Sequence, residues 1–413
     1  MRHLFILFTL CVSPVLAETV AIEGAKIYTI TNGIIENGTL VMVDGQITAV
    51  GDNVTVPDGA RIIDARGKHV APGYMASYTY LGLTESTSDI FPNDHSANES
   101  GFTAAFDVKY ALNSASPAIA ENRRQGVTRA ISAPSPSGDI FSGNSAVITL
   151  DNSVDMLVRE GPMFAQLSGN RNVAFVRLRG IFDQVLDYER NKTRAMRGQS
   201  QDYLLSIADM EALIPVVNGD KKLVLEAGNV VEIRGVIALK QDYDIDVVLI
   251  GVPEAWKLAS ELAEADIPVI INVEQNLFPN MTLPGSTFSN AERLENAGVK
   301  VAIYNGGFSN AYYLAQFAGM AVAHGMSHEG AMRSITQNVA EIFDIDDVYG
   351  SLEVGKDADV VVWDGDPLEV TSNTEHVFVR GVEYELVSRR TMLRDRYLDL
   401  DDGKPFGMRY KER

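Results

Sequence analysis

Alternating apolar strands and amphipathic helices dominate the second half of the chain and limit the folds open to it. The strand patterns span residues 246–251, 267–271 and 299–304, and the helix patterns span residues 253–262, residues 290–297 and a segment after Ser309. Such repeats predict a parallel sheet with helices outside it, as either an open doubly wound sheet or a closed barrel. No glycine-rich loop follows any of the strands, which weakens the case for a dinucleotide-binding fold.

Both ends of the chain have a different pattern, of short strands and turns. Residues 20–70 contain Asp44-Gly45 between two β-rich runs, which is a strong hairpin signal. Residues 350–382 return to the same pattern, with a turn followed by an apolar strand that ends at Trp363. Two β-rich ends around a mixed middle predict one sheet assembled from both termini.

Length and charge narrow the classes of function. At 413 residues the chain is long enough for one large domain or two ordinary ones. Hydrophobic residues at 46% and charged residues at 22% are values of a folded globular protein. The formal net charge of -20 argues against nucleic acid as a partner, because phosphate binding requires a basic face.

The first 17 residues have the pattern of a secretory signal peptide, with a basic tip, a short apolar run and a small-residue cleavage site ending at Ala17. The run is too short to span a bilayer, and no later segment is apolar for long enough. We therefore expect an exported protein, periplasmic or secreted, that begins at Glu18. Cys11 also admits a lipoprotein signal, which the bulky Leu10 disfavours. Cys11 is the only cysteine, so the mature chain would hold neither a disulfide nor a thiolate metal site.

Residues 72–82 carry the frame of a known strand: Pro72-Gly73, two apolar residues, and a closing Gly82. In this frame the chain resembles the first barrel strand of the amidohydrolase superfamily, and in particular its imidazolonepropionase-like exported members. Residues 248–271 extend the resemblance, as does the segment from Asn338-Val339-Ala340 through to the strand ending at Trp363, which is highly specific.

The resemblance implies an α/β fold: a distorted (β/α)8 TIM barrel with a small composite β-sandwich formed from both chain ends. It places the barrel at residues 72–344. The sandwich would combine residues 18–71 with residues 345–413.

The resemblance also implies a metal centre, but this chain has other residues at the positions of the metal ligands. Active members of the superfamily hold one or two metal ions with histidines from strands 1, 5 and 6, and use an aspartate at the end of strand 8. The matching positions here carry Tyr78 and Tyr80 in strand 1, Glu226 in strand 5, Gly251 after strand 6 and Asn305 after strand 8. We therefore expect a pocket lined by these five residues that holds neither a metal nor another cofactor.

Glu226, Tyr78 and Tyr80 are the candidate catalytic residues. A glutamate facing the barrel mouth needs a hydrogen-bonding partner or a raised pKa. The two tyrosines would fill the space left by the metal and hydrogen-bond to Glu226. Asp107 is the second carboxylate that we consider for paired acid–base chemistry with Glu226. A purely structural pairing of Glu226 with an arginine or a tyrosine remains the alternative.

The histidines of the mature chain do not rebuild a metal site. His324 and His328 have the four-residue spacing of a zinc helix, but the residues between them favour the end of one helix and the start of another, so we expect exposed loop histidines. His95 is expected in a solvated loop. Residues 84–101 and 190–202 are polar and are predicted to be long loops at the mouth of the barrel.

Three functions remain open. The first is an exported amidohydrolase-superfamily protein, by family a hydrolase of non-peptide carbon–nitrogen bonds, that has become a pseudoenzyme. Such a protein would bind a small-molecule ligand, form a homo-oligomer or support an intact amidohydrolase relative. The second is a metal-independent hydrolase that uses Glu226 with Tyr78 and Tyr80. The third is a structural assembly subunit with a plugged pocket.

Overall fold

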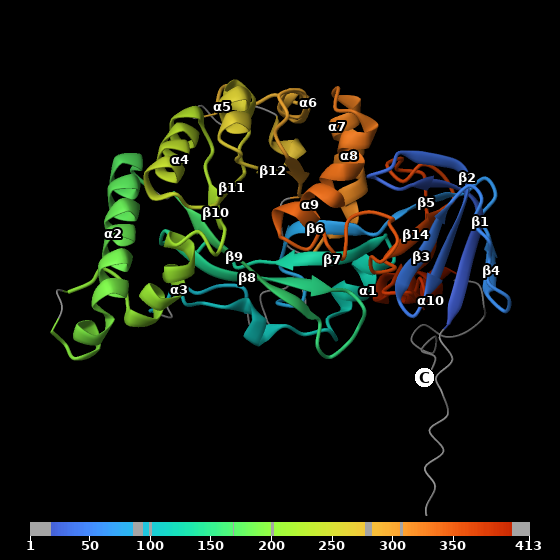
Figure 1. The fold of residues 1–413 in the computed structure, drawn as a ribbon, viewed down its shortest axis with the longest axis horizontal. Helices are drawn as coiled ribbons and strands as arrows, with labels where there is room; N and C mark the ends of the chain where they lie inside the picture. Colours follow the sequence, from blue (N-terminus) through green and yellow to red (C-terminus); the bar gives the residue numbers. More distant parts are fainter. Residues whose placement is uncertain are drawn as a thin grey trace, which may run out of the picture.

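The computed structural model describes residues 18–85, 94–98, 101–167, 169–199, 202–276, 283–305 and 309–398. Within them the chain forms two eight-stranded sheets that lie beside each other (Figure 1). One sheet contains only strands from the middle of the chain, and the other combines strands from both ends. The expected fold class, a distorted barrel with a second β domain, is confirmed. The domain boundaries near residues 72 and 344 remain predictions.

The middle sheet is a nearly closed barrel. Its strands follow one another in chain order: β6 (Tyr74–Thr79), β7 (Val127–Ser132), β8 (Phe141–Thr149), β9 (Leu157–Gln166), β10 (Leu223–Glu226), β11 (Val247–Ile250), β12 (Val269–Ile271) and β13 (Val301–Ile303). Strands β9 to β13 pair in parallel, as the alternating pattern predicts. The Ser77 hydroxyl of β6 donates to the backbone carbonyl of Ile303 in β13 at 3.0 Å, which ties the first strand to the last.

The barrel is distorted at its third strand. Strand β8 runs antiparallel to both β7 and β9. The links before and after β8, residues 133–140 and 150–156, are too short for the crossover that parallel strands require. A three-stranded antiparallel segment therefore replaces one β/α unit.

Helices cover the outer face of the parallel strands (Figure 1). Their bounds are η1 (Val108–Ala111), α1 (Pro117–Arg123), α2 (Arg171–Met196), α3 (Ile207–Val217), α4 (Val230–Tyr243), η2 (Ala255–Leu258), α5 (Ala259–Glu264), η3 (Val273–Asn276), α6 (Asn290–Asn296), η4 (Ala311–Tyr313), α7 (Leu314–Ala323), α8 (His328–Ser334), α9 (Gln337–Ile342) and α10 (Arg389–Leu398). Side-chain oxygens accept from backbone N–H groups at the starts of several of these helices, among them Asn229 at α4 and Ser327 at α8.

The barrel interior is packed with apolar side chains from alternate strand positions, as the two-residue period of a strand requires. The buried set includes Met75, Ile131, Phe164, Val224, Val248, Ile270 and Ala302. Helix α9 adds residues to the same core and holds β13 through the Asn338 amide, which donates to the Val301 carbonyl at 2.8 Å. Because Val301 begins β13, α9 closes the end of the barrel where the strands start.

The second sheet joins the two ends of the chain. It consists of β1 (Thr19–Tyr28), β2 (Ile34–Val43), β3 (Gln46–Gly51), β4 (Arg61–Asp64), β5 (His69–Pro72), β14 (Val360–Trp363), β15 (Thr374–Val379) and β16 (Val382–Tyr384). The junction is the antiparallel pairing of β5 with β14, in which Val70 faces Val362. This sheet has its own buried core, which includes Ile22, Leu40 and Phe378.

The frame of residues 72–82 has a steric explanation. A Cβ atom added at Gly73 would lie 2.2 Å from the Thr128 hydroxyl oxygen, so only glycine lets β6 start this close to β7. Gly82 closes the frame in a turn with φ +83°, a conformation that favours glycine.

The expected loop at residues 190–202 is wrong over its first part, because α2 continues to Met196. Asn191 has non-helical backbone angles and marks a kink, but the helix resumes after it. Lys192 forms an ion pair with Glu211 of α3 at 2.7 Å, and Ala195 is buried. The polar composition of this segment therefore reflects an exposed helix face.

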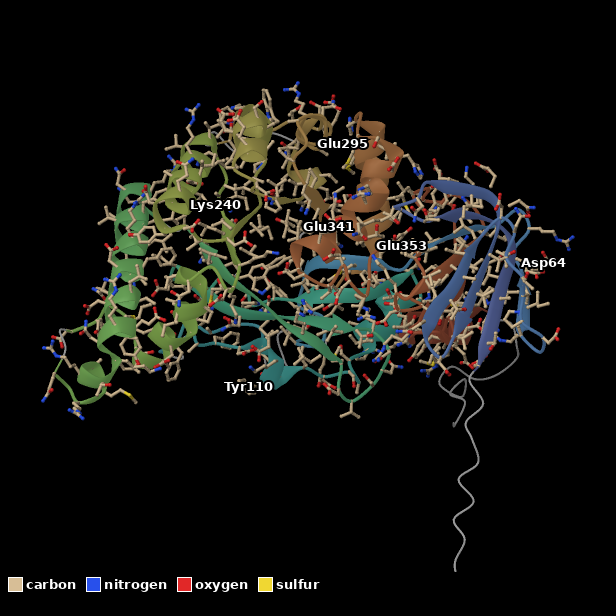
Figure 2. All side chains as sticks on the ribbon, viewed as in Figure 1. Asp64, Tyr110, Lys240, Glu295, Glu341 and Glu353 are labelled. Carbon is tan, nitrogen blue, oxygen red and sulfur yellow. The ribbon has the colours of Figure 1, made fainter. Side chains whose placement is uncertain are left out.

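Surface side chains surround both sheets; Figure 2 shows Asp64 at the outer edge of the second sheet and Tyr110 below the barrel. No helix in the part of the chain that the structure describes is long and apolar enough to cross a membrane. The expected signal peptide, residues 1–17, lies outside the described residues.

Candidate functional site

The carboxyl ends of the parallel strands meet at one rim of the barrel, which is where barrels of this kind carry their chemistry. Strand pairing sets Gln166, Glu226 and Ile250 side by side at the ends of β9, β10 and β11. Because Val224 points into the barrel core, Glu226 two residues later points the same way, into the mouth. Gly251 and Tyr304 directly follow β11 and β13 at the same rim.

Aromatic rings fill much of this mouth. The Tyr78 and Tyr80 hydroxyl groups lie 3.2 Å apart and hydrogen-bond to each other. The Tyr78 ring also packs edge-on against Tyr304, with centroids 5.7 Å apart, and stacks on Phe164 at 5.6 Å. Tyr80 and Tyr304 are buried. The tyrosines that stand at the positions assigned to histidine ligands are therefore part of a packed cluster.

These phenols stay protonated. Burial, followed by the neighbouring Tyr80, raises the pKa of Tyr78 far above its ordinary value. Burial, followed by the charge of Glu226, raises the pKa of Tyr304 in the same way. Burial also raises the pKa of Tyr80. Each hydroxyl can donate or accept a hydrogen bond, but none is a phenolate near neutral pH.

Glu226 and Tyr304 converge on the space above Gly251. A Cβ atom built on Gly251 would lie 3.7 Å from both the Glu226 Oε1 atom and the Tyr304 hydroxyl oxygen. A larger side chain would enter the space between these two groups. Gly251 has φ +67°, so its backbone also favours glycine.

The carboxyl group of Glu226 keeps contact with solvent. The pKa of this carboxyl group is raised, mainly because surrounding protein atoms partly desolvate it. The negative charge of Glu232 is the second cause. The expected hydrogen bond from Tyr78 or Tyr80 to Glu226 is wrong: the tyrosines bond to each other, and among the described residues no side chain donates to Glu226. A glutamate of this kind can take up a proton above the usual pH range of a carboxyl group.

Two other candidate residues have structural partners. The Asn305 amide donates to the backbone carbonyl of Asn310, so this side chain is engaged by the chain itself. Asp107 caps η1 by accepting from the backbone N–H of Lys109, and it forms an ion pair with the Lys109 ammonium group at 3.0 Å. Neither Asn305 nor Asp107 is paired with Glu226. Asp107 and Glu226 therefore do not form an acid–base pair in this structure.

Sequence reasoning missed three members of the cluster. Tyr304 and Phe164 belong to it because their rings pack against Tyr78. Their place near the ends of apolar strands could have predicted this. His95 is not a solvated loop residue: its ring stacks on Tyr80, with centroids 4.1 Å apart and planes 9° apart. The Nδ1 atom of His95 is buried and has no hydrogen-bond partner in the described part of the chain.

His324 and His328 lie where the sequence predicts, at the end of α7 and the start of α8. His328 is not simply exposed, however. Its Nε2 atom lies 3.0 Å from both carboxylate oxygens of Asp366, and its ring stacks on Tyr28. Tyr28 in turn bonds to His69 at 3.1 Å, so these histidines form a network between α8 and the second sheet.

The residues at the mouth do not fit a divalent metal. A catalytic zinc ion needs about three protein ligands with an open coordination position. Among the described residues the mouth offers protonated phenols, the Glu226 carboxylate and the His95 ring, and the two phenols of strand β6 already bond to each other. Among the described residues no group of three or more His, Cys, Asp or Glu side chains is placed to hold a metal ion.

Comparison with known proteins gives the class. The amidohydrolase family model matches residues 236–386. The crystal structure of an amidohydrolase from Thermotoga maritima superimposes with a TM-score of 0.79, at 24% identity, over 89% of this chain and 99% of that one. Molinate hydrolase superimposes with a TM-score of 0.53, at 19% identity, over 90% of this chain and 95% of its own. Residues 236–386 are therefore similar to the amidohydrolase family, and the fold is that of solved amidohydrolases.

Curated relatives match this chain over a smaller part of their own length. Amidohydrolase tasK of Hapsidospora irregularis is 20% identical over 84% of this chain, which spans 39% of that protein. The dihydroorotase of Mycobacterium tuberculosis is 33% identical over 21% of this chain and 20% of its own length. The chain thus spans well under two thirds of these curated relatives.

Proposed function

We propose that this protein is an exported member of the superfamily that has lost its metal centre and binds a small-molecule ligand at the mouth of its barrel. The observation that carries the proposal is the Tyr78–Tyr80 hydrogen bond at 3.2 Å. This bond joins Tyr78 to Tyr80, the two residues at the positions where amidohydrolases carry the metal-binding histidines of their first strand. Two protonated phenols, one half-buried and one buried, that bond to each other are poor ligands for an ion between them.

Glu226 would be the ligand-contacting group of this pocket. It keeps contact with solvent, whereas Tyr80 and Tyr304 are buried, and no described side chain donates to it. A polar ligand group that donates a hydrogen bond to Glu226 would satisfy the carboxyl group. The Tyr304 hydroxyl, on the other side of Gly251, is placed to accept from or donate to the same ligand.

Ligand binding can be tested by thermal unfolding in the presence of a chelator. Small amides, carbamates and amino-acid derivatives are added to the mature protein in excess EDTA. We expect at least one compound to raise the unfolding temperature of the wild type and of Glu261→Ala, an exposed glutamate on α5, but not of Glu226→Ala. Stabilisation that requires added zinc or manganese would contradict the proposal.

A metal-independent hydrolase is the second candidate, and the raised pKa of Glu226 favours it. General acid–base catalysis works best when the pKa of the catalytic group lies near the operating pH. Turnover of any of the same compounds in EDTA, abolished by Glu226→Gln, would replace the pseudoenzyme proposal with this one.

Export is a separate part of the proposal and rests on the pattern of the first 17 residues. Intact-mass measurement of protein recovered from the exported fraction tests it. We expect a chain that begins at Glu18, and a retained Met1 or an acylated Cys11 would contradict that expectation.

A further inference from the structure

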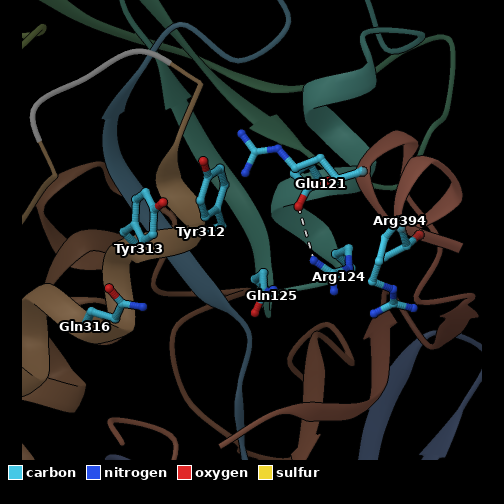
Figure 3. Close-up of a pocket in the computed structure, with 9 residues that line it drawn as sticks. Glu121, Arg124, Gln125, Tyr312, Tyr313, Gln316 and Arg394 are labelled. Carbon is cyan, nitrogen blue, oxygen red and sulfur yellow. Dashed lines mark hydrogen bonds and ion pairs between the residues drawn. The ribbon is translucent and has the colours of Figure 1, made fainter. Parts of the chain in front are cut away.

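A cavity of about 350 Å³ lies outside the barrel, between α1, the η4–α7 segment and the C-terminal helix α10. Figure 3 shows Glu121, Arg124 and Gln125 of the α1 region facing Tyr312 and Tyr313, with Arg394 on a third side. An adjoining cavity of about 120 Å³ shares Tyr312 and extends toward the loops after β6 and β13. Nothing in the proposed function uses either cavity.

Positive charge is in excess in the larger cavity, although the whole chain has a formal net charge of -20. Its lining includes the guanidinium groups of Arg124, Arg390 and Arg394 and one carboxylate, that of Glu121. Arg390 and Arg394 are four residues apart on α10, so they lie on one face of the helix. Like charges at this spacing repel each other, and the one carboxylate paired with them on α10, that of Asp395, offsets the charge of Arg394 alone.

Each arginine has a partner of its own; Arg394 binds the Asp395 carboxylate through Nε at 2.8 Å and Nη2 at 2.7 Å, which leaves its Nη1 atom for a ligand. The Arg390 guanidinium lies over the Tyr312 ring, with 4.8 Å between its Cζ atom and the ring centroid. Stacking of this kind uses the flat face of the group, and the Tyr312 hydroxyl takes up part of its N–H edge, so the remaining N–H groups are available. Arg124 forms an ion pair with Glu121 through Nη1 at 3.2 Å, but its Nε atom is buried and has no hydrogen-bond partner within the described residues.

A buried N–H group without an acceptor is unfavourable and calls for a partner. Here it belongs to a residue in the wall of a positively charged cavity. Gln125, Gln316 and the two tyrosine hydroxyls add neutral donors around the same space. Guanidinium groups match planar oxyanions best, because two parallel N–H groups meet two oxygens.

We propose that this arginine-lined cavity binds a small, multiply charged oxyanion of the phosphate or polycarboxylate type. The anion would bridge Arg390 and Arg394 of α10 to Arg124 of α1, and so fasten the C-terminal helix to the barrel. The site is independent of the barrel mouth and of any activity there.

Isothermal titration of the mature protein with inorganic phosphate, and separately with citrate, at constant ionic strength tests the proposal. The test variant is Arg390→Gln/Arg394→Gln. The matched control is Arg190→Gln/Arg194→Gln, which removes two exposed arginines of the same spacing from α2, where they line no cavity described here. Circular dichroism checks the fold of both, and Arg394→Gln alone repeats the test should the double variant not fold.

We expect saturable binding of at least one of the two anions to the wild type and to the control, weakened at least about tenfold in the test variant. The anion that binds identifies the ligand chemistry. Absence of saturable binding to the wild type would overturn the proposal. Equal weakening in both double variants would also overturn it, since it would show an effect of net charge alone, as would full binding by the test variant.

Discussion

At the scale of single residues, the barrel mouth differs from a metal centre in what its side chains can do. Tyr78 and Tyr80 are protonated and bonded to each other, and Gly251 contributes no side chain. Glu226 is the one ionisable carboxyl group among the five residues expected to line the pocket. The chemistry of the mouth therefore depends on Glu226, and the tyrosines shape its surroundings.

The raised pKa of Glu226 predicts a pH dependence of stability. A glutamate with a raised native pKa binds its proton more tightly in the folded chain, so its contribution to stability is present at low pH and is lost as the pH rises through the native pKa. Glu226→Gln should therefore unfold at a higher temperature than the wild type at neutral pH, with little difference near pH 4. Thermal unfolding between pH 4 and 8 measures this, with Glu261→Gln as an exposed control. A difference that does not change with pH would show that the native pKa is ordinary.

Removal of the Tyr78 hydroxyl tests the tyrosine cluster. Tyr78→Phe keeps the ring contacts but leaves the Tyr80 hydroxyl without this partner, so we expect a loss of about 1 kcal/mol in the free energy of unfolding. Tyr110→Phe is the control, because the Tyr110 side chain is 84% exposed and points away from the barrel (Figure 2). Urea unfolding compares the two, and equal stability of Tyr78→Phe and the wild type would argue against a structural role for the pair.

At the scale of elements, one buried ion pair joins the two sheets. Arg129 of β7 is 1% exposed and binds Asp359, just before β14, at 2.8 Å, and Asp357 at 2.5 Å. Asp359 also accepts from the backbone N–H of Arg380 at the end of β15. The pair therefore links a barrel strand to the second sheet.

Breaking this pair should be strongly destabilising. Arg129→Met leaves the buried Asp359 carboxylate without its main counter-charge, and we expect a loss of about 3–5 kcal/mol in the free energy of unfolding. Arg66→Met, which breaks the exposed pair with Asp64, should change the free energy of unfolding far less, because solvent screens that pair. Guanidinium unfolding measures both, and similar values for the two variants would mean that the buried pair does not hold the sheets together.

The sequence predicted those elements whose signal is local. The strands and helices between residues 246 and 323 follow from hydrophobic period, and the paired ends follow from their β-rich pattern. The inverted strand β8 was not predicted, because strand direction depends on the length of the links and on pairing across the sheet. The end of α2 was missed because an exposed, polar helix face and a polar loop have the same composition.

The candidate site was predicted in position but not in its contacts. The frame of residues 72–82 places Tyr78 and Tyr80 at the rim, and the strand ends place Glu226 and Gly251 there. Which of these side chains bond to one another depends on packing between strands far apart in the chain. For this reason the Tyr78–Tyr80 bond, the approach of Tyr304 to Glu226 and the stack of His95 on Tyr80 came only from the structure.

At the scale of the whole molecule, a barrel like that of solved amidohydrolases is combined with a second sheet, and a tyrosine cluster fills much of its mouth. The β5–β14 pairing holds the second sheet together, and the Arg129 ion pairs link that sheet to the barrel. None of these contacts requires a metal ion. These contacts would hold the fold together without a metal ion, as the proposed ligand-binding role requires.

The metal content of the mature protein tests this account most directly. The protein is purified without added metal or chelator, and zinc, manganese and iron are quantified per chain by mass spectrometry for the wild type and for Glu226→Ala. The account predicts far less than one metal ion per chain in both. One tightly bound ion per wild-type chain, lost in Glu226→Ala, would contradict it and return the protein to the metal-dependent hydrolases.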